Sequence, residues 1–158
     1  MSGMSRIVKT ITNITLPLIV IYGLYIILHG HLTPGGGFQG GAVVASGLAM
    51  IVVSYGSVWT MKKIKEKKLS TLESIGAISF IGLAFLGLLY GTKFFDNWFA
   101  NSGGMFGDIV SYGNTAATIN SAGVLPLMNI AVGLKVIAGL FAIVLVMAYA
   151  TSKVKREA

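Results

Sequence analysis

The chain has 158 residues, of which 54% are hydrophobic and only 11% are charged, and its mean hydropathy is +0.80. This charged share is less than half of that in soluble globular domains, which excludes an ordinary soluble protein. The net charge is +7, but the basic residues lie at the ends of apolar runs instead of forming one basic surface, so no nucleic-acid partner is expected. The chain contains no cysteine, which excludes disulfides, iron–sulfur clusters and thiol chemistry.

Four apolar runs have the length of a membrane span. Crossing about 30 Å of hydrocarbon takes roughly 20 residues, and a span without access to water must satisfy its own backbone as a helix. The sequence therefore predicts an all-α integral membrane protein, with a single transmembrane domain over residues 1–158. Its four transmembrane helices are expected at about residues 7–28, 38–61, 73–95 and 125–150.

The basic residues are distributed unevenly between the connections. They precede the first run and follow the second and the fourth, whereas the connections after the first and third runs are poor in charge. This pattern predicts cytoplasmic N and C termini, with residues 29–37 and 96–124 outside a plasma membrane that the chain crosses several times. The basic residues concerned are Arg6, Lys9, Lys62, Lys63, Lys65, Lys67, Lys68, Lys153, Lys155 and Arg156.

The connection after the first run carries a glycine-rich motif. Its proline stops helix propagation, and its glycines allow backbone angles that other residues avoid. Small residues four positions apart also let another helix approach closely in lipid, so a tight turn followed by close helix packing is favoured. The alternative is that free amide groups at the start of the second span hold an anion or a carboxylate. The motif consists of Pro34, Gly35, Gly36, Gly37, Phe38, Gln39, Gly40 and Gly41.

Two histidines, His29 and His31, flank the start of this turn. Histidine titrates near neutral pH, so interfacial hydrogen bonding and proton handling both stay open for them, as does binding of a metal. Two ligands do not make a metal site, and no other strong ligand is near in the sequence, so no metal centre is predicted.

The third span is preceded by Ser70-Thr-Leu-Glu73, which has the spacing of a capping box. We expect Glu73 to satisfy the start of that helix, and we keep it as a candidate group of an ion or proton pathway. The connection that follows, residues 96–124, is long for an outer loop and has no predicted role. A short amphipathic segment is expected around residues 105–112.

Lys135 is the one charge expected well inside a span, about 9 Å along the helix from Asn129. Ionisable residues are costly in a membrane and mark either a transport pathway or a buried ion pair. A lysine in this half of the span can also extend its side chain toward the outer surface, because side chains lean toward the N-terminus of their helix. All three interpretations remain open.

The segment Gly30-His-Leu-Thr-Pro-Gly-Gly-Gly-Phe-Gln-Gly-Gly41 resembles the signature of the MrpB/MnhB family, and Asn129-Ile-Ala-Val-Gly-Leu-Lys-Val-Ile-Ala-Gly139 resembles the last helix of that family. Its members are small membrane subunits of multisubunit Na⁺/H⁺ antiporters. Related subunits occur in archaeal membrane-bound hydrogenases and sulfur reductases. The resemblance implies a cofactor-free subunit that works with other membrane subunits, near the route of Na⁺ and H⁺.

The sequence contains no nucleophile–base pair, phosphate loop or cofactor motif, so the chain is not expected to be an enzyme by itself. No carboxylate is expected within a span, so partners would have to supply the anionic ligands for sodium. The expected function is an accessory subunit of a Na⁺/H⁺ antiporter or of an antiporter-linked respiratory complex. The alternatives are a small homo-oligomeric channel or transporter and a purely structural scaffold.

Overall fold

The computed structural model describes residues 3–32, 34–90, 93–100, 102–104, 106–108 and 122–157, without the side chains of residues 155–157. The described residues form five helices, and four of these are long and apolar enough to cross a membrane. The prediction of an all-α protein with four transmembrane helices is therefore confirmed. Most of the amphipathic segment expected at residues 105–112 lies outside the described residues. The helices are α1 (Arg6–Leu28), α2 (Gly36–Tyr55), α3 (Ser57–Lys63), α4 (Glu66–Tyr90) and α5 (Leu125–Glu157).

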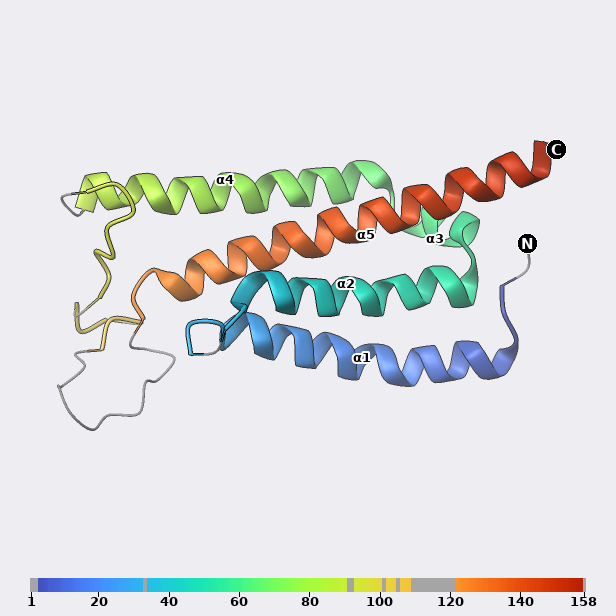
Figure 1. Ribbon diagram of the computed structural model, residues 1–158, viewed down its shortest axis with the longest axis horizontal. Helices are drawn as coiled ribbons and strands as arrows, with labels where there is room; N and C mark the ends of the chain where they lie inside the picture. Colours follow the sequence, from blue (N-terminus) through green and yellow to red (C-terminus); the bar gives the residue numbers. More distant parts are fainter. Residues whose placement is uncertain are drawn as a thin grey trace.

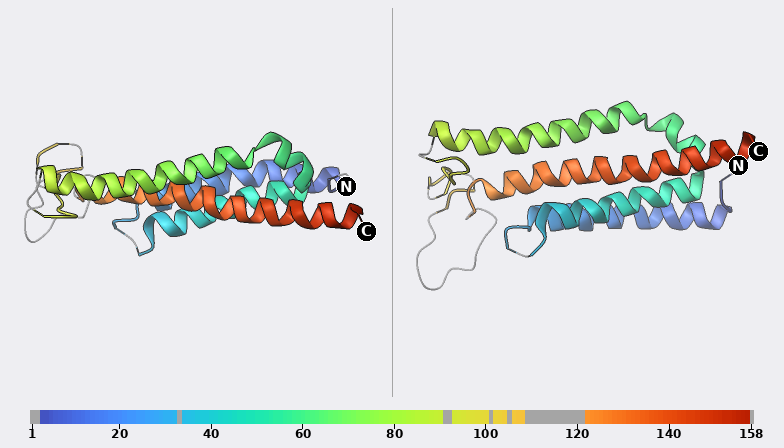
Figure 2. Two further views of the ribbon diagram at one scale, coloured as in Figure 1. Left: turned by 90° about the horizontal axis from the view of Figure 1, so that it is seen from above. Right: turned by 45° about the horizontal axis from the view of Figure 1, so that its top comes forward.

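The four long helices lie side by side in the order α1, α2, α5 and α4 (Figure 1). The turned views show that they form a flattened layer (Figure 2). In an apolar 18-residue stretch of each span, 44% is buried within the chain in α2, but only 17% in α1 and 17% in α4. The two helices at the edges of the layer, α1 and α4, therefore leave most of their apolar surface to lipid or to other proteins.

Both chain ends lie at the same end of this layer, together with α3 (Figure 1). An even number of spans requires this arrangement. The segment before α1 is tied to α2, because the backbone N–H of Met4 donates a hydrogen bond to the carbonyl of Ser54 at 2.9 Å. That this end faces the cytoplasm stays a prediction.

The second span was predicted as one helix over residues 38–61, but the structure divides it. Helix α2 ends at Tyr55, and Gly56 adopts φ +88° and ψ 148°, which breaks the helix before α3 begins. Only glycine adopts such a conformation without strain. After the break, α3 packs on α5 and α2, so the lysine-rich connection starts with a short helix.

The third span begins at Glu66 instead of residue 73 and ends at Tyr90, before the predicted residue 95. The predicted capping box is wrong, because Ser70 and Glu73 both lie inside this helix. Glu66 occupies its first turn, where an acidic residue stabilises the helix dipole, and the following lysines favour helix. The hydroxyl of Thr71 donates to the carbonyl of Lys67 at 2.8 Å, within this added part.

Helix α5 is the centre of the packing. Its side chains Phe141 and Leu145 are fully buried, and they form a cluster with Ala45 and Val52 of α2 and Leu69 of α4. This helix extends to Glu157, beyond the predicted end at residue 150. Because α5 contacts every other helix, it positions the polar groups described next.

Candidate functional site

The glycine-rich motif forms a sharp turn into α2. Gly35 caps this helix with φ +104°, and a Cβ at this position would overlap the side chain of Gln39. Gly36 follows with φ +31°, and the backbone N–H of Gln39 donates to the carbonyl of Gly35 at 3.1 Å. The turn therefore requires glycine for two reasons, a left-handed backbone and lack of space.

Beyond the turn, the glycines of α2 face two different helices. A Cβ on Gly40 would lie 2.5 Å from the carbonyl oxygen of Gly23 in α1. A Cβ on Gly41 would lie 2.8 Å from Cβ of Val136 and 3.0 Å from the carbonyl oxygen of Gly133, both in α5. The motif thus lets α2 pack between α1 and α5 at backbone distance, as small residues do in membrane helices.

Asn129 of α5 lies against the same turn, and sequence reasoning did not select it as a site residue. A Cβ on Gly30 would lie 2.9 Å from Nδ2 of Asn129, and one on Gly36 would lie 2.9 Å from its Oδ1. The amide therefore packs between the two ends of the turn. An amide side chain at the start of an otherwise apolar span was the signal available in the sequence.

The two histidines lie at the C-terminal end of α1. His29 caps this helix: its backbone N–H donates to the carbonyl of Tyr25 at 2.9 Å, and its ring stacks on the Tyr25 ring at 4.9 Å. His31 follows in the turn and is partly buried. Among the described residues, no group of three or more histidine or acidic side chains could hold a metal ion.

Glu73 and Lys135 lie on the facing sides of α4 and α5. A Cβ on Gly139 would lie 3.4 Å from Cδ and Oε1 of Glu73, so the carboxylate packs on the backbone of α5. In return, a Cβ on Gly76 would lie 2.9 Å from the backbone nitrogen of Lys135 and 3.0 Å from its Cβ. Each charged residue therefore lies against a glycine of the other helix.

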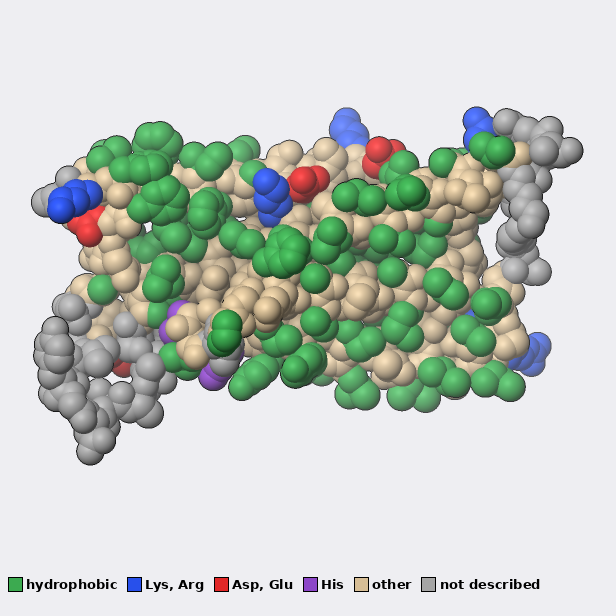
Figure 3. All heavy atoms as spheres, in the orientation of Figure 1, with side chains coloured by type: hydrophobic (Ala, Val, Ile, Leu, Met, Phe, Trp, Pro, Cys, Tyr) green, Lys and Arg blue, Asp and Glu red, His purple; other side chains and the backbone are tan. Residues whose placement is uncertain are grey.

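This contact lies deep in the layer. Gly139 is the fifteenth of the 30 residues in the span Leu125–Val154, so the Glu73 carboxylate packs against its middle. Between its two ends, the face shown in Figure 3 is mostly hydrophobic and carries only a few acidic and basic side chains. The expectation that no carboxylate lies within a span is therefore wrong.

The directions of α4 and α5 favour opposite orientations of the two charged side chains. Side chains lean toward the N-terminus of their own helix, and α4 and α5 run in opposite directions. We therefore expect Glu73 to lean toward the end with the chain termini, and Lys135 to lean toward the other end. Neither side chain forms a hydrogen bond or an ion pair with another described residue. Charges at this depth are costly in a membrane. For the exposed Lys135, extension of the side chain toward the surface stays open as an alternative to compensation by another subunit.

A cavity of about 260 Å³ adjoins the contact between α4 and α5. The exposed side chain of Lys135 lines it, and so does Gly76, whereas its other walls are apolar. The remaining lining residues are Ala77, Phe80, Ile81 and Val132.

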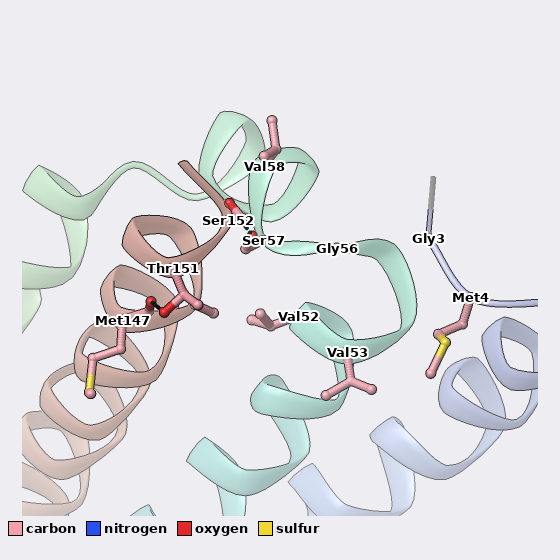
Figure 4. A pocket seen from close by; sticks show the side chains of 11 residues that line it. Gly3, Met4, Val52, Val53, Gly56, Ser57, Val58, Met147, Thr151 and Ser152 are labelled. Atoms are coloured by element: carbon pink, nitrogen blue, oxygen red, sulfur yellow. Dashed lines mark hydrogen bonds between the residues drawn. The ribbon is translucent and has the colours of Figure 1, made fainter. Parts of the chain in front are cut away.

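A second cavity, of about 610 Å³, lies at the end with the chain termini, between the segment before α1, the α2–α3 junction and α5 (Figure 4). None of the described residues that line it is charged. The Ser57 hydroxyl donates to the Ser152 hydroxyl at 3.2 Å, and the Thr151 hydroxyl donates to the carbonyl of Met147 at 2.9 Å. These hydroxyl groups form their hydrogen bonds within the chain. The described lining of this cavity therefore has no charged group comparable to Glu73 or Lys135.

Together, these features define a multi-span membrane protein whose helices pack through glycines and which carries two charged residues, Glu73 and Lys135, at the contact between two of its spans. The chain belongs to the family described as a domain related to the MnhB subunit of Na⁺/H⁺ antiporter, whose model matches residues 7–142. The resemblance seen in the sequence is thereby confirmed.

Three relatives illustrate this membership. An uncharacterized protein of Methanocaldococcus jannaschii is 38% identical over 126 residues, which cover 78% of this chain and 44% of that protein. A Na⁺/H⁺ antiporter subunit of Bacillus subtilis is 31% identical over 83 residues, or 52% of this chain and 50% of that protein. Another Na⁺/H⁺ antiporter subunit, from Alkalihalophilus pseudofirmus, is 28% identical over 93 residues, or 59% of this chain and 64% of that protein. The chain spans about half the length of the curated relatives it matches.

Proposed function

We propose that this chain is an accessory membrane subunit of a multisubunit Na⁺/H⁺ antiporter in the plasma membrane. The observation that carries the proposal is the match to the MnhB family model over residues 7–142, together with the similarity to two proteins named as Na⁺/H⁺ antiporter subunits. The whole chain acts as one transmembrane domain with both ends in the cytoplasm. Its partners are other membrane subunits, and the complex transports Na⁺ and H⁺.

The shape of the chain supports a role within a larger assembly. The outer helices α1 and α4 bury little of their surface within the chain, and large apolar side chains are exposed along both. Backbone-distance packing through glycines makes the layer rigid, so α1 and α4 can serve as fixed docking surfaces. The chain itself carries no catalytic reaction in this proposal.

Glu73 and Lys135 are the groups that we assign to the ion route. The carboxylate of Glu73 accepts a proton or a cation at mid-depth, and Lys135, about one helical turn toward the other end, sets the local charge. His29 and His31 lie at that other end, where they can pass protons between the outside and the complex. A neighbouring subunit closes the site over the exposed face of α4 and α5.

Purification of the native complex in mild detergent tests this function. A tagged chain should bring down several different membrane proteins in fixed ratios, and an untagged strain is the control. Recovery of the chain only with copies of itself contradicts the proposal and favours the homo-oligomeric channel. The composition also identifies the host: hydrogenase or sulfur reductase subunits in the complex would place the chain in the antiporter module of an energy-converting oxidoreductase.

A separate result distinguishes the scaffold alternative. If the complex contains the chain but transports Na⁺ normally after replacement of both Glu73 and Lys135, the chain supports the complex without contributing to the ion route.

A further inference from the structure

A groove runs between α1 and the junction of α2 and α3, at the end of the layer that carries both chain termini. Its volume is about 410 Å³. Apolar side chains form one part of its wall, and the exposed side chains of Asn13, Trp59 and Lys63 lie at its mouth, whereas Thr60 is fully buried. The lining residues are Leu16, Ile51 and Ile64 in the apolar part, with Asn13, Tyr55, Trp59, Thr60 and Lys63 around them.

The helix break at Gly56 builds the mouth of the groove. It places the ring of Trp59 on the ring of Tyr55, with the ring centroids 4.8 Å apart and the planes at 24°. The hydroxyl of Tyr55 donates to Oδ1 of Asn13 in α1 at 2.9 Å, which ties the aromatic pair to the opposite wall. Tyrosine and tryptophan are enriched at the level of the lipid headgroups, so the mouth lies where a headgroup would be.

Two lysines flank the aromatic pair from different helices. The ammonium group of Lys9 lies 5.5 Å from the centroid of the Tyr55 ring, and that of Lys63 lies 6.0 Å from the centroid of the Trp59 ring. Lys63 therefore lies at the groove, which it lines, and Lys9 lies beside it, against Tyr55 of its wall. None of the described residues that line the groove is acidic, so an anion meets no repulsive charge there.

We propose that this groove binds a phospholipid with an anionic headgroup. One acyl chain lies along the apolar part, and the phosphate lies between Lys9 and Lys63. Charge complementarity selects this occupant over an apolar helix of another subunit, because such a helix would leave both cations without a counter-charge. The proposal does not depend on the function of the complex, since it rests on the groove alone.

Lipid binding to the purified, delipidated chain tests the proposal. Native mass spectrometry counts bound lipid during titration with phosphatidylglycerol or, for comparison, with zwitterionic phosphatidylcholine. The Lys9→Gln/Lys63→Gln double variant removes the two groove cations. The Lys67→Gln/Lys68→Gln double variant is the matched control, since it removes the same charge from α4, away from the groove. Size-exclusion chromatography verifies that both variants remain folded.

The parent chain should prefer phosphatidylglycerol, and this preference should fall by roughly fivefold per lysine, or about 25-fold, in the groove variant and hardly in the control. Equal losses in the two double variants, or no preference in the parent, would overturn the proposal. A photoreactive residue at Leu16 adds a second measurement in the intact complex. An adduct with lipid supports the assignment, whereas an adduct with another subunit shows that protein occupies the groove.

Discussion

Gly40→Ala is the sharpest test of the close packing between α1 and α2. A Cβ at this position would lie 2.5 Å from the carbonyl oxygen of Gly23 and 2.6 Å from Cγ1 of Ile27. Ordinary van der Waals contact begins at 3.4 Å, so the carbonyl must move away by about 0.9 Å. Such overpacking typically costs about 1–3 kcal/mol, although alanine recovers about 1 kcal/mol through its higher helix propensity.

Gly82→Ala is the matched control for this substitution. Gly82 also lies inside a long helix, α4, but nothing lies within 4 Å of an added Cβ. The control therefore gains the helix propensity without the steric conflict. The difference in the free energy of unfolding between the two variants isolates the packing cost, which we expect to be about 1–3 kcal/mol.

The assay is unfolding of the purified chains in one mild detergent, titrated with a denaturing detergent and followed by circular dichroism. Gly40→Ala should unfold at a lower concentration of denaturing detergent than the parent, and Gly82→Ala at the same or a higher one. Identical midpoints for the two variants would refute the conclusion that α1 and α2 approach at backbone distance.

Two further predictions concern the charged contact and the topology. Glu73→Gln should leave the complex assembled while Na⁺/H⁺ exchange falls by about tenfold or more, as expected when a proton-accepting group is lost. Lys135→Ala should also impair transport in an intact complex, whereas Lys135→Arg should retain part of the transport activity because the charge stays. If all three variants transport Na⁺ like the parent complex, both residues are dispensable. In intact cells an impermeant thiol reagent should label Ser102→Cys but not Ser70→Cys, without background because the chain has no cysteine. Labelling of Ser70→Cys from outside would reverse the orientation.

The spans could be predicted because their signal is local and strong. Runs of about 20 apolar residues indicate membrane helices regardless of tertiary structure, and the first and fourth begin within one residue of the predicted positions. The spacing of the glycines indicated a close helix contact, but it could not identify the partner. In the structure Gly40 faces α1 and Gly41 faces α5, which depends on the order of helices in the layer.

The charged contact could not be predicted because its local pattern had two solutions. Ser70 and Glu73 have the spacing of a capping box, but the same residues fit inside a helix that begins at Glu66. The choice shifts the carboxylate by almost two helical turns, from the end of the span to the middle of the layer. Only the packing of α4 on α5 shows that Glu73 lies against Gly139 and that Lys135 lies against Gly76.

The central claim is that this chain is needed for Na⁺/H⁺ exchange by its complex. This claim can be tested with everted membrane vesicles from cells with and without the chain. Na⁺ is added to vesicles with an established pH gradient, and a fluorescent dye reports the change in internal pH. Loss of the Na⁺-dependent response in vesicles without the chain, and its recovery when the chain is supplied again, is the predicted result. An unchanged response in vesicles whose remaining subunits are present at normal levels would contradict the account.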